Sequence, residues 1–247
     1  MDKIRISAIS YLNSIPFVYG LEKSSVQSQI ELSLDIPSEC AKKLLDNKVD
    51  IGLVPVAIIP QLKFSEIISS YCIGSNGPVE TVCVFSQVPL NDIEEIQLDF
   101  HSKTSVQLVQ LLSKKYWCIS PKFKHSKEGF ENDLTDKQAG VIIGDRAYQY
   151  RSQFKYVYDL SEEWKKYTVL PFVFACWIAN KSLPEQFKQS FVEALDYGVG
   201  RLDLSLEEKG MNFPSSINQK RYLTEIISYD LDAEKKHSLA RFLEEIS

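Results

Sequence analysis

The segment IRISAISYLNSIP, residues 4–16, carries the pattern that decides the fold. Its first half alternates apolar and polar residues, which predicts a β-strand. The polar stretch that follows predicts a loop, and Pro16 predicts the start of a helix, because proline is favoured in a first helical turn. A polar loop between a strand and a helix is the usual place where a β–α unit forms a binding site.

Strand and helix continue to alternate after this segment. Residues 32–36 predict a strand, residues 37–47 a helix with one apolar face, and residues 49–56 a buried strand that ends at a proline. Nearly continuous apolar strands that alternate with helices indicate a parallel sheet covered on both faces. The predicted fold class is therefore α/β.

Two segments predict that the chain passes from one lobe to another and back. The turn signal GSNGP at residues 74–78 precedes a predicted strand at 79–86, and the apolar run at 170–179 predicts a long strand. We therefore expect two lobes with a ligand cleft between them. The first lobe is discontinuous and the second is inserted into it; their predicted bounds are 1–80 plus 176–247, and 81–175.

Further elements are expected inside these lobes. Residues 96–100 and 139–145 predict short strands, and a helix with a leucine-rich face follows residue 105. Beyond residue 184 the chain is predicted to be helical, with amphipathic helices at 219–227 and 233–246.

Composition limits the classes of function. The 247 residues suffice for two modest lobes, and the net charge of −5 argues against binding to nucleic acid. An acidic protein still binds a small anion where its cleft is locally positive. The five cysteines show no paired spacing, so we expect reduced core thiols. With no predicted signal peptide and no long apolar segment, a cytoplasmic location without a membrane partner is expected.

Familiar catalytic motifs are absent from the sequence, including the dinucleotide fingerprint, the P-loop, the nucleophile elbow and the zinc-protease helix. The three histidines, His101, His125 and His237, are widely separated, so no metal site is expected. Of these, only His101 falls near a predicted strand end.

The candidate site consists of polar residues that follow strands, because ligands of open α/β sheets bind at the carboxyl ends of strands. Residues 102–105 precede a helix, whose free N–H groups and dipole favour an anion. Simple capping by Ser102 or Thr104 explains the same pattern. Asn13 also fits an Asx turn, and Asp145 also fits a helix cap.

Several strings in order resemble one family. They are SYLNSIP at 10–16, VDIGLVP at 49–55, SNGPV at 75–79, LD at 98–99 with Ser102 and Thr104-Ser105, IGD at 143–145, YDL at 158–160 with Trp164, and LPFVFA at 170–175 with Thr168 and Trp177. The sequence resembles the chorismate dehydratases of menaquinone biosynthesis by the futalosine route. The resemblance implies a fold like the type II periplasmic binding proteins. It also implies a lyase that removes water from chorismate to leave 3-[(1-carboxyvinyl)oxy]benzoate, with no cofactor or metal.

The resemblance also implies roles for residues. Asn13, Thr81 and Asp145 are the expected catalytic residues, with Asn13 orienting the substrate and Asp145 either a general base or a cap. The substrate's own carboxylate is another candidate base. Thr81 stands where the family usually has serine, and the role of the preceding Glu80 stays open. The expected substrate-binding residues are Ser10, Tyr11, Pro55, Gly77, Ser102, Thr104, Ser105, Gly144 and Phe172.

Two other functions remain open at this point. One is a non-catalytic cytoplasmic binder of a small carboxylate. The other is the sister enzyme of the same pathway, which acts on cyclic dehypoxanthinyl futalosine and is expected to present a histidine in the cleft. The Gly-Asp pair at 144–145 and the apolar run at 170–177 favour the dehydratase. The expected partner is a small molecule, with the protein either a monomer or a homodimer.

Overall fold

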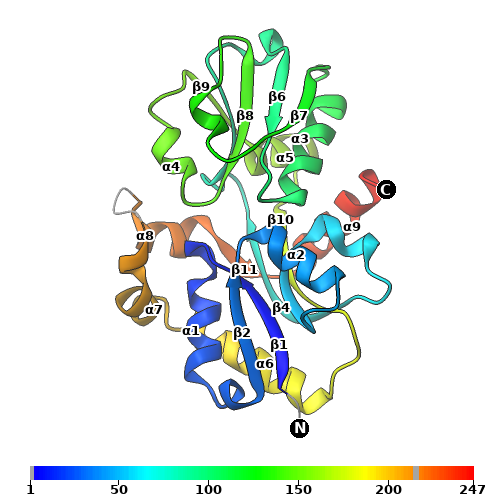
Figure 1. The fold of residues 1–247 in the computed structure, drawn as a ribbon, viewed down its shortest axis with the longest axis vertical. Helices are drawn as coiled ribbons and strands as arrows, with labels where there is room; N and C mark the ends of the chain where they lie inside the picture. The colour runs from blue at the N-terminus through cyan, green and yellow to red at the C-terminus, as the bar shows by residue number, and fades with distance from the viewer. Residues whose placement is uncertain (1–2, 214–216) are drawn as a thin grey trace.

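The computed structural model describes residues 3–213 and 217–247 as a mixed α/β protein with two sheets, one above the other along its long axis (Figure 1). Residues 1, 2 and 214–216, which the predicted first lobe includes, lie outside the described part. None of the helices in that part is both long and apolar enough to cross a lipid bilayer.

The lower sheet has six strands in the order β11-β4-β10-β3-β1-β2. β1 pairs in parallel with β2 and β3, whereas β10 lies antiparallel between β3 and β4. The predicted parallel β–α units therefore form one half of a mixed sheet. The strands are β1 (Ile4–Ile9), β2 (Ile30–Asp35), β3 (Ile51–Pro55), β4 (Glu66–Ser75), β10 (Phe172–Ala179) and β11 (Ser228–Asp230).

The upper sheet has five strands in the order β7-β6-β8-β5-β9. β6 pairs in parallel with β7 and β8, and β5 lies antiparallel to β8 and β9. The strands are β5 (Val82–Ser86), β6 (Glu95–Leu98), β7 (Lys122–His125), β8 (Gln138–Ile143) and β9 (Tyr156–Asp159).

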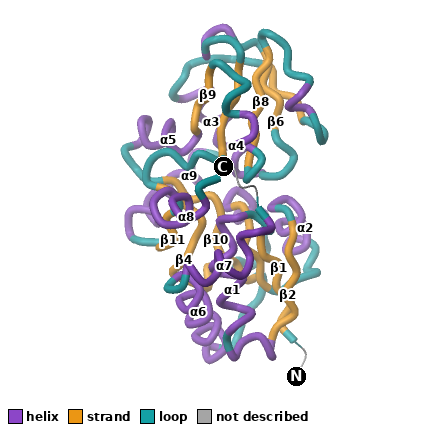
Figure 2. The backbone as a smooth tube through the Cα atoms, turned by 90° about the vertical axis from the view of Figure 1, so that its left-hand side faces the viewer, coloured by secondary structure: helices purple, strands orange, loops and turns teal. Residues whose placement is uncertain are grey.

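Helices cover both sheets, and the side view in Figure 2 shows α1, α6 and α7 gathered beside the lower one. α1 and α6 touch through glycine: a Cβ on Gly20 would lie 1.9 Å from the Ala194 carbonyl oxygen. The α-helices are α1 (Ile15–Lys23), α2 (Pro37–Leu45), α3 (Lys103–Lys115), α4 (Ala147–Tyr150), α5 (Leu160–Thr168), α6 (Glu185–Val199), α7 (Leu202–Lys209), α8 (Gln219–Arg221) and α9 (Ala233–Glu245).

The chain passes between the sheets twice, from β4 to β5 and from α5 to β10. The predicted strand at 79–86 begins only at Val82, so its first three residues were predicted wrongly. Glu80 has a φ of 65°, which lies outside the extended region. The lobe boundaries at 80/81 and 175/176 remain a proposal, and the second falls inside β10.

Two strands of the lower sheet, β4 and β11, were not predicted, and the predicted helix between residues 219 and 227 is present in a different form. β4 was not predicted, and it runs through the first two residues of the expected turn at 74–78. The helix expected at 219–227 is the short α8 followed by a π-helix at Tyr222–Ile226. The chain then extends into β11, which pairs with β4. Tertiary pairing, rather than local propensity, determines these segments.

The carboxylate of Asp159, at the end of β9, holds the first passage in place. One oxygen accepts the N–H groups of Val79 and Glu80 at 3.0 and 2.7 Å. The other caps α5 by accepting from Ser161 and Glu162 at 3.0 and 3.2 Å. A single buried side chain therefore binds the segment that enters the upper sheet and starts the helix that leaves it.

We expect Asp159→Ala to lower the free energy of unfolding by roughly 3 to 4 kcal/mol, because a helix cap and two further buried N–H groups lose their acceptor. Asp159→Asn keeps one acceptor oxygen and should lose less. Urea denaturation of both variants measures this. If the alanine variant costs no more than the roughly 1 kcal/mol of an ordinary cap, Asp159 does not stabilise the passage.

Candidate active site

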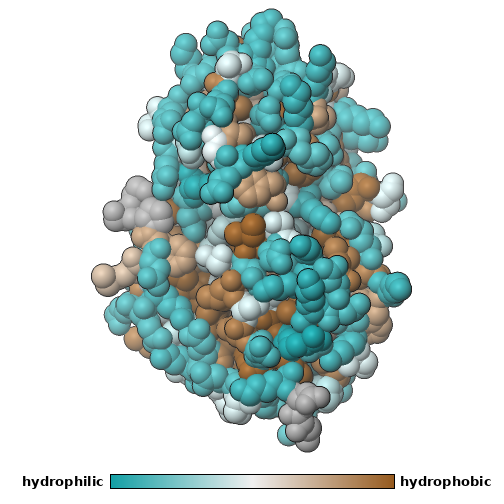
Figure 3. All heavy atoms as spheres, in the orientation of Figure 1, coloured by the Kyte–Doolittle hydropathy of each residue, from teal (hydrophilic) through white to brown (hydrophobic). Residues whose placement is uncertain are grey.

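A cavity that is partly open to solvent lies where β1, β3 and β8 end and β5 begins; the empty space between its walls, open solvent included, is about 450 Å³. The molecule consists of a lower and an upper body, each built around one of the two sheets. Apolar residues also come to the surface near the middle of the molecule, where these two bodies meet (Figure 3). The walls of the cavity come from both sheets. They are Ile9, Tyr11, Asn13, Pro37, Pro55, Ile73, Val79, Thr81, Val82, Ser102, Ser105, Ile143, Gly144, Phe174 and Ala175.

The structure brings seven of the twelve predicted site residues into this lining: Tyr11, Asn13, Pro55, Thr81, Ser102, Ser105 and Gly144. The sequence did not single out the apolar walls, since nothing in an apolar residue distinguishes a cavity wall from core. The five predicted residues outside the lining are Ser10, Gly77, Thr104, Asp145 and Phe172.

Thr104 is fully buried beside the cavity, and its hydroxyl joins the two bodies. It donates to the carbonyl of Phe174 and accepts the N–H of Ala57, both at 3.2 Å. The hydroxyl is thus already satisfied by backbone groups of the lower body. Its observed contacts hold α3 against that body.

Phe172, Gly77 and Ser10 are also outside the lining. The Phe172 ring packs edge-on against Trp164 and Phe242, with centroids 5.4 and 5.1 Å away. Gly77 forms the turn of the first passage with a φ of 137°, a conformation that favours glycine. Ser10 is exposed to solvent.

At one side of the cavity, Asn13 and Thr81 meet at the hydroxyl of Tyr222. The Tyr222 hydroxyl lies 2.8 Å from the Thr81 hydroxyl and accepts from the Asn13 amide at 3.5 Å. Tyr222 is fully buried, and burial raises the pKa of its phenol so that it stays protonated. Sequence reasoning missed Tyr222, which lies more than 200 residues from Asn13.

At another side, the start of α3 presents Ser102 and Ser105. The Ser102 hydroxyl caps the helix by accepting the N–H and the hydroxyl of Ser105, both at 3.3 Å. The capping interpretation therefore holds for Ser102. The first N–H groups of the helix have no preceding turn to bind, so this end also favours a negative charge.

Tyr11 forms part of the wall and leads to His101. The Tyr11 hydroxyl lies 2.6 Å from Nδ1 of His101, which is outside the lining. Burial lowers the pKa of His101, which favours the neutral imidazole. Gly144 packs closely against the Tyr11 ring. Its φ is 74°, and a Cβ at this position would come within 2.8 Å of ring atoms of Tyr11.

Asp145 follows Gly144 and reaches across to the loop after β1. One oxygen accepts the N–H of Leu12 at 3.1 Å, whereas Oδ1 is buried without a hydrogen-bond partner in the described part of the chain. Burial raises the pKa of Asp145 to about 6. The side chain makes no cap for α4, so that predicted alternative is wrong.

Glu80 connects three segments around the cavity. Its carboxylate accepts two hydrogen bonds from Arg221, at 3.1 and 2.7 Å, and one from the Tyr148 hydroxyl at 2.7 Å. The Arg221 guanidinium lowers the pKa of Glu80, so the carboxylate stays ionised. Glu80 thereby links the first passage to α4 and α8.

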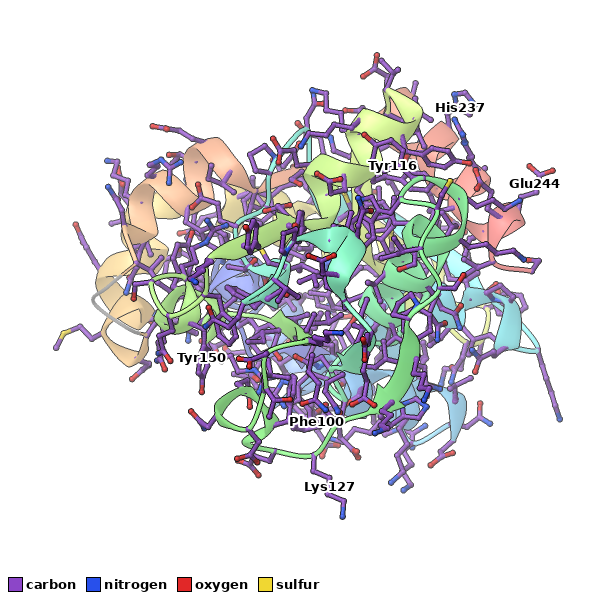
Figure 4. All side chains as sticks on the ribbon, turned by 90° about the horizontal axis from the view of Figure 1, so that it is seen from above. Phe100, Tyr116, Lys127, Tyr150, His237 and Glu244 are labelled. Carbon is purple, nitrogen blue, oxygen red and sulfur yellow. The ribbon has the colours of Figure 1, made fainter. Side chains whose placement is uncertain are left out.

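The arginine next to Asp145 is paired. Arg146, next to Asp145, forms ion pairs with Asp99 and Glu131. No group of three or more potential metal ligands occurs within residues 3–213 and 217–247. His237 lies at the outer edge of the molecule on α9 (Figure 4), and His125 is exposed at the end of β7.

Solved structures of known proteins share this fold. A protein from Archaeoglobus fulgidus matches with a TM-score of 0.79 at 15% identity, over 98% of this chain and 96% of that chain. A Candida albicans protein described as having the generic periplasmic binding protein fold matches with a TM-score of 0.69 at 13% identity, over 100% and 90%. The periplasmic aliphatic sulphonate binding protein of Escherichia coli gives 0.56 at 15% identity, over 99% and 92%. The protein thus has the two-lobed α/β fold of periplasmic binding proteins, as predicted.

Within that fold, the chain belongs to the menaquinone biosynthesis family, whose model matches residues 4–247. It is also 29% identical to a chorismate dehydratase of Thermus thermophilus over 190 residues, which are 68% of this chain and 68% of that protein. The predicted family resemblance is thereby confirmed.

We expect Asp145→Asn to raise stability near neutral pH. The raised pKa means that the folded protein holds this proton more tightly than the unfolded chain does. The stabilisation is complete below pH 3.8 and is lost as the pH rises through about 6. The asparagine variant avoids this loss, worth up to about 3 kcal/mol. Its oxygen still accepts from Leu12.

Urea denaturation of both proteins across this pH range measures the effect. As a control of opposite sign, Asp50→Asn should destabilise at neutral pH, because hydrogen bonds from Arg5 and Lys181 outweigh burial and lower the pKa of Asp50 to about 2. Equal stability of wild type and Asp145→Asn at every pH would contradict the prediction.

Proposed function

We propose that the protein is a chorismate dehydratase, a lyase that converts chorismate to 3-[(1-carboxyvinyl)oxy]benzoate and water in menaquinone biosynthesis. The observation that carries the proposal is one cavity whose polar wall combines Asn13, Thr81 and the start of α3. The family and the dehydratase relative supply the reaction.

The cavity offers the kinds of contact that a ring-shaped dianion such as chorismate requires. The start of α3, with Ser102 and Ser105, is suited to one carboxylate through backbone N–H groups, the helix dipole and hydroxyls. Asn13 and Thr81 supply further hydrogen bonds. Apolar side chains, among them Ile73 and Phe174, can hold the ring in orientation between them.

The reaction needs little from the protein beyond position and charge stabilisation. The C3 proton is vinylogous to the ring carboxylate, so its removal spreads the negative charge into that carboxylate. The electron pair then forms the third ring double bond as the C4 hydroxyl leaves and takes up a proton to become water. Aromatisation supplies the driving force, and fixed hydrogen-bond donors stabilise the charge that develops.

Asp145, which follows the lining residue Gly144 but is outside the lining itself, is our proposed base for the C3 proton. A pKa near 6 places the carboxylate close to the range at which a base is effective and still ionised at neutral pH. The unpaired, buried Oδ1 is the oxygen free to take a proton. The substrate's own carboxylate is the alternative base.

Hydrogen bonds between the two bodies hold the walls of the cavity together. The Leu12 N–H binds Asp145, and the Thr104 hydroxyl binds the backbone of Ala57 and Phe174. In such a partly enclosed cavity each hydrogen bond to the substrate is stronger than in water, because the local dielectric is lower.

The sister enzyme that acts on cyclic dehypoxanthinyl futalosine is the second candidate, because His101 lies next to the wall residue Tyr11. His101, like Asp145, is outside the lining, and its Nδ1 is engaged with the Tyr11 hydroxyl. Incubating the purified protein separately with each substrate, and identifying the products by ultraviolet absorbance and mass, decides between them. Folded protein that leaves chorismate unchanged would refute the dehydratase proposal.

We expect Asn13→Ala to reduce kcat/KM for chorismate by at least about 100-fold, as loss of a charge-stabilising donor does. Its stability should fall only by about 1 kcal/mol. The matched control is Asn180→Ala: Asn180 donates to the backbone of Leu44 and Val49, away from the cavity, and its loss should lower stability without lowering turnover. Equal turnover by wild type and Asn13→Ala would remove Asn13 from the site.

The pH dependence of kcat/KM tests the base. If Asp145 accepts the proton, the rate rises as the pH passes through about 6 and then levels off, since only the ionised carboxylate is active. The Asp145→Asn variant should lose this inflection together with most of its rate. A rate that rises only near about pH 4, where free carboxylates titrate, would point to the substrate's own carboxylate instead.

A further inference from the structure

Tyr222 joins two polar groups of the cavity wall that belong to different sheets. Asn13 follows β1 of the lower sheet, and Thr81 immediately precedes β5 of the upper sheet. The Tyr222 hydroxyl contacts both side chains, although the residue itself is outside the lining. A phenol that only needed a partner would be satisfied by any nearby carbonyl. This phenol instead bonds to the two side chains that the proposed reaction uses.

The donors in this group run in one direction. The Ser14 hydroxyl donates to Oδ1 of Asn13 at 3.2 Å, which turns Nδ2 of Asn13 toward Tyr222. With the Tyr222 oxygen accepting from Asn13, its proton is free for the Thr81 oxygen at 2.8 Å. Each bond in such a chain polarises the next.

This series of hydrogen bonds ends at the hydroxyl proton of Thr81. In the structure this proton is directed to the Val79 carbonyl at 3.4 Å, close to the outer limit for a hydrogen bond. A substrate oxygen that comes closer to Thr81 would replace this weak acceptor. Tyr222 thereby leaves Thr81 as a donor toward the cavity rather than an acceptor.

The segment that carries Tyr222 is held firmly from two sides. Tyr222 begins a five-residue π-helix, a form that is rare and frequent at functional sites. The preceding Arg221 binds Glu80 with two hydrogen bonds. The ring of Tyr148, which also binds Glu80, meets the Tyr222 ring edge-on at 6.1 Å between centroids.

We propose that Tyr222 is a positioning residue of this site: its phenol donates to Thr81 and so directs the Thr81 proton at the substrate, and it gives the Asn13 amide a second, weaker contact. The inference rests on the proposed dehydratase function. Tyr222 touches no substrate; it sets the direction of two groups that do.

The test compares Tyr222→Phe, Thr81→Val and the double variant in steady-state turnover of chorismate. Tyr222→Phe keeps the buried ring and removes only the hydroxyl. We expect its kcat to fall roughly 10- to 100-fold, with KM little changed, because misoriented groups cost rate more than ground-state binding. If Tyr222 acts through Thr81, the double variant should be about as slow as Thr81→Val alone.

Tyr71→Phe is the matched control. Tyr71 is also buried, and its hydroxyl donates to Asp196 at 2.7 Å, outside the cavity lining. Both phenylalanine variants should lose a similar, small amount of thermal stability. Only Tyr222→Phe should lose turnover, which separates positioning from general support of the fold.

Three outcomes would overturn the inference, and they are distinguishable. If wild type does not convert chorismate, the proposed function and the role of Tyr222 fall together. If wild type converts chorismate and Tyr222→Phe has the kcat of Tyr71→Phe, the role of Tyr222 alone is wrong. If the losses from Tyr222→Phe and Thr81→Val multiply in the double variant, Tyr222 does not act through Thr81.

Discussion

The hydrogen bonds of Asp159 are the constraint on which the site depends most. The chain must leave the lower sheet after β4 and return to it as β10, and Asp159 binds backbone N–H groups from the outgoing passage and from the start of α5. This fixes the residues directly before Thr81, so the Thr81 side chain enters the cavity at a set position. Because the carboxylate is buried, its bonds do not compete with water. The position of Thr81 in the cavity wall therefore depends on Asp159, a side chain outside the cavity.

Sequence patterns predicted the β–α units and the polar loop at Asn13 well, because these depend on local periodicity and turn chemistry. They failed where distant pairing decides. β4 is a strand because β10 and β11 bind its two edges, and Glu80 interrupts the expected strand because Asp159 captures its N–H. Tyr222 carries no local signal, since its partners are brought to it only by the closed fold. Thr104 was predicted from its position at a helix start, but the direction of its hydroxyl depends on the opposing backbone.

The proposed substrate carries two negative charges, yet the arginine nearest the cavity in sequence, Arg146, is paired with Asp99 and Glu131. In the described structure the polar wall instead consists of hydroxyls, an amide and the start of α3. Neutral donors and a helix dipole suit a reaction in which charge moves through the substrate. A fixed ammonium or guanidinium beside one carboxylate would hold the charge there, whereas spread dipoles stabilise it wherever it develops.

Asp145 and Tyr222 are both buried at this site, but they differ in whether their polar atoms have hydrogen-bond partners. The phenol is buried with both neighbours bonded, so it stays neutral and keeps its orientation. The carboxyl is buried, and one of its oxygens has no hydrogen-bond partner among the described residues; burial disfavours the ionised form and raises the pKa. Folding gains nothing from that second arrangement, because an uncharged side chain of the same shape would be more stable there. A proton acceptor is expected to be a group that is kept beside a cavity at a cost to stability. The Leu12 N–H orients the carboxylate by binding Oδ2 and leaves Oδ1 free.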